Sequence, residues 1–279
     1  MVNPTRTVRT MLFVALSIIT ILLSGLYQPI AAQPLLDSLA LTKRQPELLA
    51  RSLSQLESTR ASQPQLYFVG FAGYGRQSVF KREVLAVRQM FDDRFGTTGR
   101  SIALINHPST ANETPLATTK NLDAALQHVG KLMDVDRDTL FLFLSSHGVT
   151  GTFIVEMPGL ALKSLKPEQL KGMLLRSGIK RQVIVVSSCH SGSFIPALAG
   201  PTALVITAAR SDRSSFGCDD GRRWTYFGDA FFNRALREET SFRRAFASAK
   251  RLITLWEVRD RFIPSLPQMA GGEALTDVD

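Results

Sequence analysis

Two short segments of the sequence place a histidine and a cysteine among glycines and serines. His147 and Gly148 follow an apolar run that ends in two serines, and Cys189 follows another run with the same ending. A cysteine becomes a strong nucleophile as its thiolate, and an imidazole within hydrogen-bond reach can take up the proton. Nearby glycine leaves backbone N–H groups free for an oxyanion, and the amides of Gly148 and Cys189 are the candidate donors. The pair predicts a nucleophilic cysteine assisted by a histidine.

The elements that must position this pair follow from the hydrophobic pattern after residue 64. Five apolar runs predict buried strands, at residues 66–73, 101–106, 139–146, 182–188 and 202–209. Apolar residues three and four apart predict helices at 81–95, 121–133 and 167–176 and within 229–261. A hairpin or edge strand is expected at 151–157.

This alternation of strands and helices indicates an α/β fold with a mostly parallel sheet covered by helices on both faces. Ligands bind beyond the carboxyl ends of the strands in such sheets. His147 and Cys189 each follow a strand directly. We therefore expect them to face each other across one crevice if their strands are neighbours.

The first 32 residues differ in composition from the rest of the chain. Two arginines precede an uncharged apolar stretch at residues 11–27, and small residues at 31–32 fit a cleavage site. The length of the stretch leaves two interpretations open, a cleaved signal peptide and an N-terminal membrane anchor. Both predict an exported protein, either periplasmic or anchored to the inner membrane and facing the periplasm.

The remaining chain divides into three parts. Residues 33–63 are interpreted as a linker or pro-segment, in which leucines at helical spacing predict a short amphipathic helix. Residues 64–265 form the predicted α/β domain. Residues 266–279 are interpreted as a C-terminal tail.

Composition limits the chemistry available to this chain. A hydrophobic fraction of 44% supports a packed core, whereas two cysteines and four histidines are too few for a disulfide framework or a four-cysteine zinc site. We expect no metal. The net charge of +9 permits attraction to anionic surfaces, but export argues against nucleic acid as a partner.

The order of histidine and cysteine separates the classes of cysteine enzyme. No histidine follows His190, which excludes papain-like and α/β-hydrolase arrangements, where the histidine lies far downstream of the nucleophile. His190 adjoins Cys189 and is expected to point away from it. His107 and His128 are interpreted as structural. A histidine followed 42 residues later by the cysteine is the arrangement of caspase-like cysteine peptidases.

Three ordered blocks resemble the legumain family of cysteine peptidases. They are HGVTG at 147–151, SCHSGS at 188–193, and ITAARSDRSSFGC at 206–218 followed by TYFGD at 225–229. The resemblance covers residues 65–240. It implies a caspase-like three-layer α/β/α sandwich and an endopeptidase acting on peptide or protein substrates. It also implies that His147 assists Cys189, that backbone amides hold the oxyanion, and that no metal or organic cofactor takes part.

The resemblance also implies a pocket for the substrate residue before the scissile bond. Ser215 and Asp229 match pocket residues, and Ser187 stands where the family has an acidic residue two positions before the nucleophile. Asp229 could favour a basic substrate residue by charge or accept a hydrogen bond from asparagine. Its alternative role is that of a carboxylate at a helix N-terminus.

Other functions remain open at this level. A non-catalytic caspase-like binding domain at the envelope is one alternative, and acyl transfer to an amine through the same pair is another. Cys218 is either a structural free thiol or the partner of Cys189 in a redox-switching bond.

Overall fold

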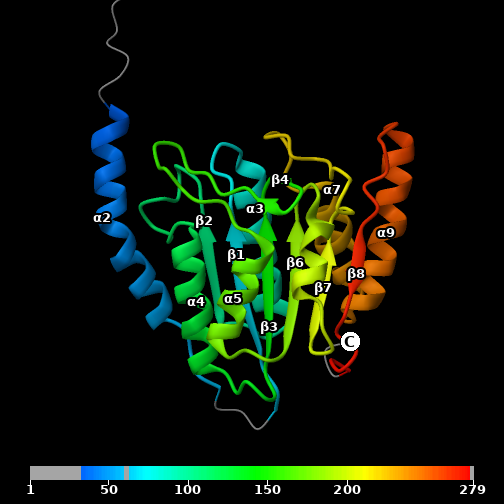
Figure 1. Ribbon diagram of the computed structural model, residues 1–279, viewed down its shortest axis with the longest axis horizontal. Coiled ribbons are helices and arrows are strands. Elements are labelled where there is room, and N and C mark those ends of the chain that lie inside the picture. The colour runs from blue at the N-terminus through cyan, green and yellow to red at the C-terminus, as the bar shows by residue number, and fades with distance from the viewer. Residues whose placement is uncertain (1–32, 60–62, 277–279) are drawn as a thin grey trace, which may run out of the picture. The chain divides into compact units, whose positions relative to one another are not determined.

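The structure is a computed structural model that describes residues 33–59 and 63–276, of which Leu41 onward belong to one compact unit. Its main sheet has six strands in the order β2-β1-β3-β6-β7-β8 (Figure 1). Five strands run parallel: β1 (Leu66–Ala72), β2 (Ser101–Ile105), β3 (Thr139–Ser145), β6 (Gln182–Ser187) and β7 (Ala203–Thr207). Each falls within a predicted run.

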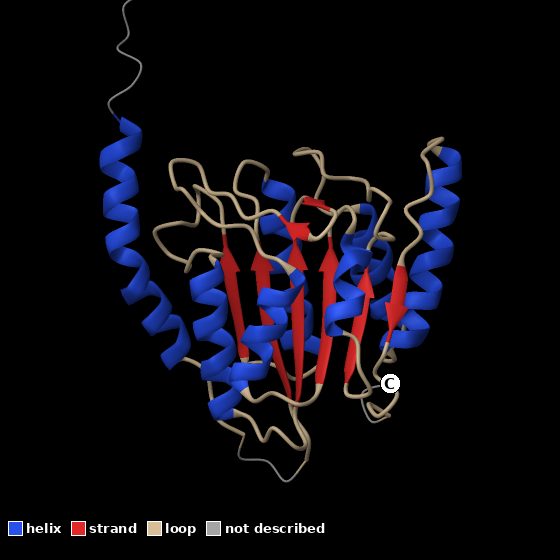
Figure 2. Ribbon diagram, viewed as in Figure 1, coloured by secondary structure: helices blue, strands red, loops and turns tan. Residues whose placement is uncertain are grey.

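Helices cover both faces of this sheet (Figure 2). One face packs against α3 (Ser78–Arg94), α9 (Phe242–Arg259) and a helix that runs from α7 (Tyr226–Gly228) through the π-helical η2 (Asp229–Ala235) to α8 (Leu236–Glu238). The other face packs against α4 (Thr119–Leu132), α5 (Pro167–Ser177) and α6 (Ile195–Leu198). The short η1 (Ser191–Phe194) precedes α6. The predicted three-layer α/β/α sandwich with a mostly parallel sheet is confirmed.

Strand β3 shows why its sequence is a continuous apolar run. Phe141 and Phe143 point into the core under α3 and α9, whereas Leu140, Leu142 and Leu144 point into the core under α4 and α5. All five side chains are fully buried. A central parallel strand has no solvent face, so both sets of alternating residues are apolar.

A small hairpin follows β3 and begins earlier than the hairpin or edge strand predicted at 151–157, so that only its second strand lies in that range. Strands β4 (Gly148–Val149) and β5 (Thr152–Phe153) pair antiparallel, and Gly151 between them has a φ of 71°. Glycine adopts this left-handed conformation without the steric cost of a side chain. The hairpin turns the chain back over the carboxyl end of the sheet.

The segment interpreted as a linker contains the helix α2 (Gln33–Ser54). From Leu41 onward it packs on the α4 side, where Leu56 is buried and Leu49 and Leu53 are partly buried. The Gln45 amide bonds backbone groups of Ala111 and Leu116 at 3.3 and 2.7 Å. The predicted export segment at residues 11–27 lies outside the described residues. Within residues 33–59 and 63–276, no helix combines the length and apolarity needed to cross a membrane.

The segment interpreted as a tail, residues 266–279, contributes a strand to one side of the sheet within its described part, which ends at residue 276. β8 (Gln268–Ala270) pairs antiparallel with β7, with Thr207 opposite Gln268 and Val205 opposite Ala270. Leu275 then enters the core at 2% exposure. A strand of three residues is too short to produce a periodic pattern, which is why the sequence did not reveal it.

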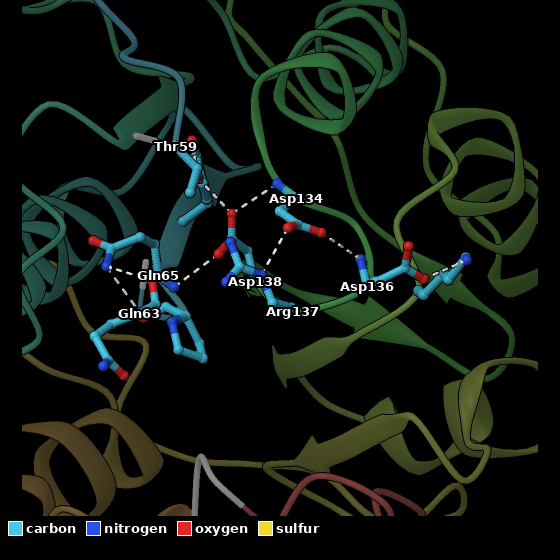
Figure 3. A network of polar contacts seen from close by, with 10 residues as sticks. Thr59, Gln63, Gln65, Asp134, Asp136, Arg137 and Asp138 are labelled. Atoms are coloured by element: carbon cyan, nitrogen blue, oxygen red, sulfur yellow. Dashed lines mark hydrogen bonds and ion pairs between the residues drawn. The ribbon is translucent and has the colours of Figure 1, made fainter. Parts of the chain in front are cut away.

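The amino ends of β1 and β3 are held together by one buried carboxylate (Figure 3). Asp138 accepts hydrogen bonds from the backbone N–H groups of Gln65 and Asp134, each at 2.8 Å, and from the hydroxyl of Thr59. These contacts join three segments that are distant in sequence. They lie at the amino ends of the strands, whereas His147 and Cys189 follow the carboxyl ends. The contacts stabilise the sheet that positions that pair.

Candidate active site

The register of two neighbouring strands brings the candidate catalytic segments together. Ser145 at the end of β3 lies opposite Ser187 at the end of β6, and the Ser146 N–H donates to the Ser187 carbonyl at 3.1 Å. His147 and Cys189 each follow two residues later. The condition for the two residues to meet, that their strands are neighbours, is therefore fulfilled, and the two segments leave the sheet side by side.

Gly148 allows the hairpin to lie against the turn that carries the cysteine. A Cβ atom at Gly148 would fall 2.4 Å from the carbonyl oxygen of Cys189 and 2.8 Å from the Ser188 hydroxyl. The backbone N–H of Cys189 makes no hydrogen bond to any described residue. It is therefore an unused donor at the carboxyl end of the sheet, and its role as an oxyanion donor stays a prediction.

The sulfur of Cys189 rests against Ser215, in the loop that joins β7 to α7 (the β7–α7 loop, residues 208–225). The Ser215 N–H points at Sγ from 3.3 Å, and the Ser215 carbonyl and hydroxyl oxygens lie 3.5 and 3.8 Å from it. Cys189 is partly exposed. The predicted pocket residue Ser215 thus lies directly beside the sulfur of the predicted nucleophile Cys189.

The ring of His147 packs edge to face against Tyr74 and Phe80, with ring centroids 4.6 and 5.0 Å apart. Its Nε2 lies 2.5 Å from Oε1 of Gln77. Burial lowers the pKa of His147, and Glu156 opposes this shift more weakly. The shift favours the neutral imidazole, which is the form that can accept a proton.

No hydrogen bond joins His147 to Cys189 in the described part of the chain. Catalytic hydrogen bonds in free enzymes are often long and tighten when substrate binds. His190 is held elsewhere, because its Nδ1 lies 3.0 Å from the Ser211 carbonyl. His107 contacts Ser78 at the start of α3, with Nε2 3.0 Å from the hydroxyl.

The other two predicted pocket residues occupy different surroundings. Ser187 is 2% exposed, and its hydroxyl lies 3.4 Å from that of Thr225 in the interior. Asp229 begins the π-helical segment η2, where it accepts a hydrogen bond from Asn233 at 2.6 Å and pairs with Arg234 at 3.3 Å. It also borders a hollow of about 220 Å³.

Sequence reasoning missed Glu83, a fully buried carboxylate beneath the site. Its oxygens accept hydrogen bonds from the Ser145 hydroxyl at 2.5 Å and from the N–H and hydroxyl of Thr225 at 3.1 and 2.7 Å. Burial raises the pKa of Glu83. The residue ties α3 to the end of β3 and to the start of α7. Its position on the apolar face of α3, between Phe80 and Val87, is a signal that could have revealed it.

Both cysteines are free thiols. Burial is the main cause that raises the pKa of Cys218 to about 12, with Cys189 and Glu83 adding to the shift. Because both cysteines are free thiols, the redox-switching bond between Cys189 and Cys218 is not formed in this structure. Across the described residues, no group of histidine, cysteine, aspartate and glutamate side chains is arranged to hold a metal ion.

Comparison with known proteins places these features in a family. The sequence profile of the peptidase C13 family matches residues 119–275, more than half of the chain. The chain belongs to the peptidase C13 family. The matched region contains His147, Cys189, Ser215 and Asp229, and it confirms the resemblance to the legumain family.

Two individual proteins were also found to be similar to this C13 chain. Legumain from Mus musculus is 30% identical over 95 residues, which are 33% of this chain and 22% of the mouse protein. The chain thus spans about a fifth of that curated relative. The crystal structure of caspase-1 from Spodoptera frugiperda superposes with a TM-score of 0.49 at 13% identity, covering 77% of this chain and 89% of that one.

Proposed function

We propose that this legumain-like member of the C13 family is a cysteine endopeptidase that acts through Cys189 and His147. The observation that carries the proposal is the pairing of Ser145 with Ser187. This pairing brings the segments of Cys189 and His147 together at the carboxyl end of the sheet. Chemistry in parallel α/β sheets takes place beyond this edge.

The reaction proceeds in two stages. His147 takes up the thiol proton as Cys189 sulfur attacks the peptide carbonyl carbon, and the carbonyl oxygen becomes an oxyanion held by the N–H groups of Gly148 and Cys189. His147 then protonates the departing amine as the C–N bond breaks, which leaves a thioester. Water, deprotonated by His147, hydrolyses this acyl-enzyme and restores the thiol.

Ser215 and Asp229 are proposed to receive the substrate residue before the scissile bond. Ser215 lies against the nucleophilic sulfur, so a substrate that reaches Cys189 also passes this residue. The Asp229 carboxylate already has Asn233 and Arg234 as partners. A hydrogen bond from a substrate amide adds to these contacts, whereas a substrate cation would compete with Arg234.

The place of action is proposed to be the cell envelope, because of the apolar stretch at residues 11–27. Fractionation of cells that express the full chain tests this. Recovery in the periplasm or inner membrane is expected, whereas recovery in the cytosol would contradict it.

The test of the activity is cleavage of fluorogenic peptides varied at the residue before the scissile bond, by the full-length chain under reducing conditions. Cys189→Ala should abolish cleavage, while Cys218→Ala, which removes the other cysteine, should retain it. Added hydroxylamine reports transfer to an amine, since it competes with water for the acyl-enzyme. No cleavage by the wild type, together with a Cys189 inert to iodoacetamide, would refute the peptidase and favour a binding domain.

A further inference from the structure

The end of α9 and the turn after it expose a group of apolar side chains. Half of the large apolar side chains that are exposed in the described residues lie within 255–263. We call these four the α9 patch: Leu255, Val258, Phe262 and Ile263, which are 65, 70, 40 and 72% exposed. Apolar side chains scattered singly over a surface are ordinary, whereas a group of them marks a surface that binds a protein or a membrane.

The turn that carries half of the patch is held by bonds to its backbone. The Arg261 N–H donates to the Val258 carbonyl at 3.2 Å, and the Phe262 N–H donates to the Glu257 carbonyl at 2.8 Å. These bonds form a Schellman motif, in which Arg261 is left-handed with a φ of 58°. The buried Glu257 carboxylate also accepts the Ser265 N–H at 3.1 Å. The turn therefore presents its apolar side chains on a well-bonded frame.

The α9 patch lies at the carboxyl end of the sheet. The turn leads into β8, which pairs antiparallel with β7 and so starts at the carboxyl end of that strand (Figure 1). The Phe262 ring stacks on that of Phe216 in the β7–α7 loop, with centroids 4.2 Å apart and planes at 11°. Phe216 directly follows Ser215, which contacts the Cys189 sulfur. The patch thus borders the loop that lines the candidate active site.

Arginines adjoin the apolar side chains. Arg251 lies one helical turn before Leu255 in α9. Arg222 of the β7–α7 loop lies 4.8 Å from the centroid of the Tyr226 ring, and that centroid is 6.0 Å from the centroid of the Phe262 ring. Basic side chains therefore border both the helical part of the patch and its turn.

These positive charges are not neutralised by their neighbours. Both arginines, and Arg261 within the turn, are exposed and form no ion pair with a described acidic residue. The acidic residues of 255–263 are already engaged, because Glu257 is buried and Asp260 pairs with Arg259 at 2.7 Å. The surface thus combines exposed apolar side chains with uncompensated positive charge.

This combination matches the interface of an anionic lipid bilayer. Apolar side chains enter the boundary between headgroups and acyl chains, and arginines are attracted by the negative surface potential. A second copy of the chain fits less well, because two such patches would bring like charges face to face. The proposed place of action, the cell envelope, supplies a lipid surface.

We propose that the α9 patch docks the protein on the surface of an anionic lipid bilayer. Its apolar side chains enter the interface, while Arg222, Arg251 and Arg261 attract the headgroups. This contact is separate from the predicted anchor at residues 11–27. It goes beyond the proposed peptidase function and requires no catalysis.

The two tryptophans of the chain provide the readout. Trp256 lies in α9 between two patch residues, and Trp224 lies in the β7–α7 loop two residues after Arg222. Lipids with brominated acyl chains quench tryptophan fluorescence on contact. We expect brominated phosphatidylglycerol vesicles to quench the full-length chain, and brominated phosphatidylcholine vesicles, which carry no net charge, to quench it less. Residues 1–32 contain no tryptophan, so insertion of that stretch alone does not give the signal.

Variants assign the contact to the patch. Ile263→Ser should raise the phosphatidylglycerol concentration at half-maximal quenching on the order of 10-fold, and Val258→Ser added to it should raise this concentration further. Leu175→Ser is the matched control, because this leucine of α5 is also 72% exposed, and it should titrate as the wild type does. Arg251→Gln combined with Arg261→Gln should raise the midpoint on the order of 10-fold, and high salt should act in the same direction.

Several results would overturn the proposal. One is a wild type whose fluorescence anionic vesicles leave unquenched, and another is an equal effect of Ile263→Ser and Leu175→Ser. A patch that binds peptide would instead show a raised KM for soluble peptides in Ile263→Ser with an unchanged lipid titration. A patch that binds a second copy would show a dimer in sedimentation that Ile263→Ser dissociates, again with an unchanged lipid titration.

Failure of the docking is distinguishable from failure of the peptidase. Cys189→Ala should bind phosphatidylglycerol vesicles as the wild type does, because the nucleophile takes no part in the contact. Quenching by a chain that cleaves no peptide would preserve the docking surface and refute only the peptidase.

Discussion

Replacement of Glu83 tests how the site is held together. Glu83→Ala removes the acceptor of three hydrogen bonds, from the Ser145 hydroxyl and from the N–H and hydroxyl of Thr225, and leaves a void in a fully buried place. A buried group left without its partner costs about 1–3 kcal/mol, and the hydroxyls can rotate towards other acceptors. With the void included, we expect a loss of about 3–5 kcal/mol in unfolding free energy.

Glu83→Gln retains the shape and one acceptor oxygen, and so separates hydrogen bonding from charge. The folded-state pKa of Glu83 is raised by burial, so the folded protein binds the carboxyl proton more tightly than the unfolded chain does. The stability of the wild type must therefore fall as pH rises from the unfolded pKa through the folded pKa, by up to about 1.4 kcal/mol per pH unit. The glutamine variant lacks this contribution.

The assay is urea unfolding of the full-length chain between pH 4.5 and 8, followed by tryptophan fluorescence. Glu83→Gln should gain stability relative to the wild type as pH rises. Glu113→Gln, at an exposed position, is the matched control and should run parallel to the wild type. Parallel pH profiles for Glu83→Gln and the wild type would refute the raised pKa, and a loss below about 1 kcal/mol in Glu83→Ala would refute the role of the hydrogen bonds.

Two further predictions concern the cysteines and the hairpin. Because burial raises the pKa of Cys218 to about 12, its thiolate fraction at pH 8 is on the order of 10⁻⁴. Brief exposure to iodoacetamide should therefore label Cys189 and spare Cys218, as measured by peptide mass mapping. Comparable labelling of both cysteines would contradict this. Gly148→Ala would place a methyl group 2.4 Å from the Cys189 carbonyl oxygen and should lower kcat/KM by on the order of 100-fold, with a stability loss of about 1–3 kcal/mol. Gly200→Ala, where a Cβ meets no atom within 4 Å, is its control, and equal activities of the two variants would count against the close approach at the site.

Much of the fold was predictable because its signals are local. The apolar runs of the five parallel strands mark segments buried on both faces, and the helices between them carry apolar stripes. The stretch at 229–261 was predicted only as helical material. The structure divides it, because Ser241 caps a new helix by accepting a hydrogen bond from the Arg244 N–H.

The candidate catalytic residues were predictable for a related reason. His147 and Cys189 directly follow strands, and the carboxyl ends of parallel strands share one edge of the sheet. Residue type and position relative to a strand end therefore indicate the pair without any knowledge of side-chain contacts.

Sequence by itself thus determined the order of the elements, the parallel sheet, the family blocks and the strand ends that carry His147 and Cys189. Tertiary structure alone decided that Gln77 bonds the histidine 70 positions later, that Glu83 is buried between Ser145 and Thr225, and that a three-residue strand closes the sheet edge. The physical reason is the range of the interactions. Propensity and periodicity act between near neighbours in the chain, whereas these contacts join segments whose proximity exists only after the sheet and its helices have packed.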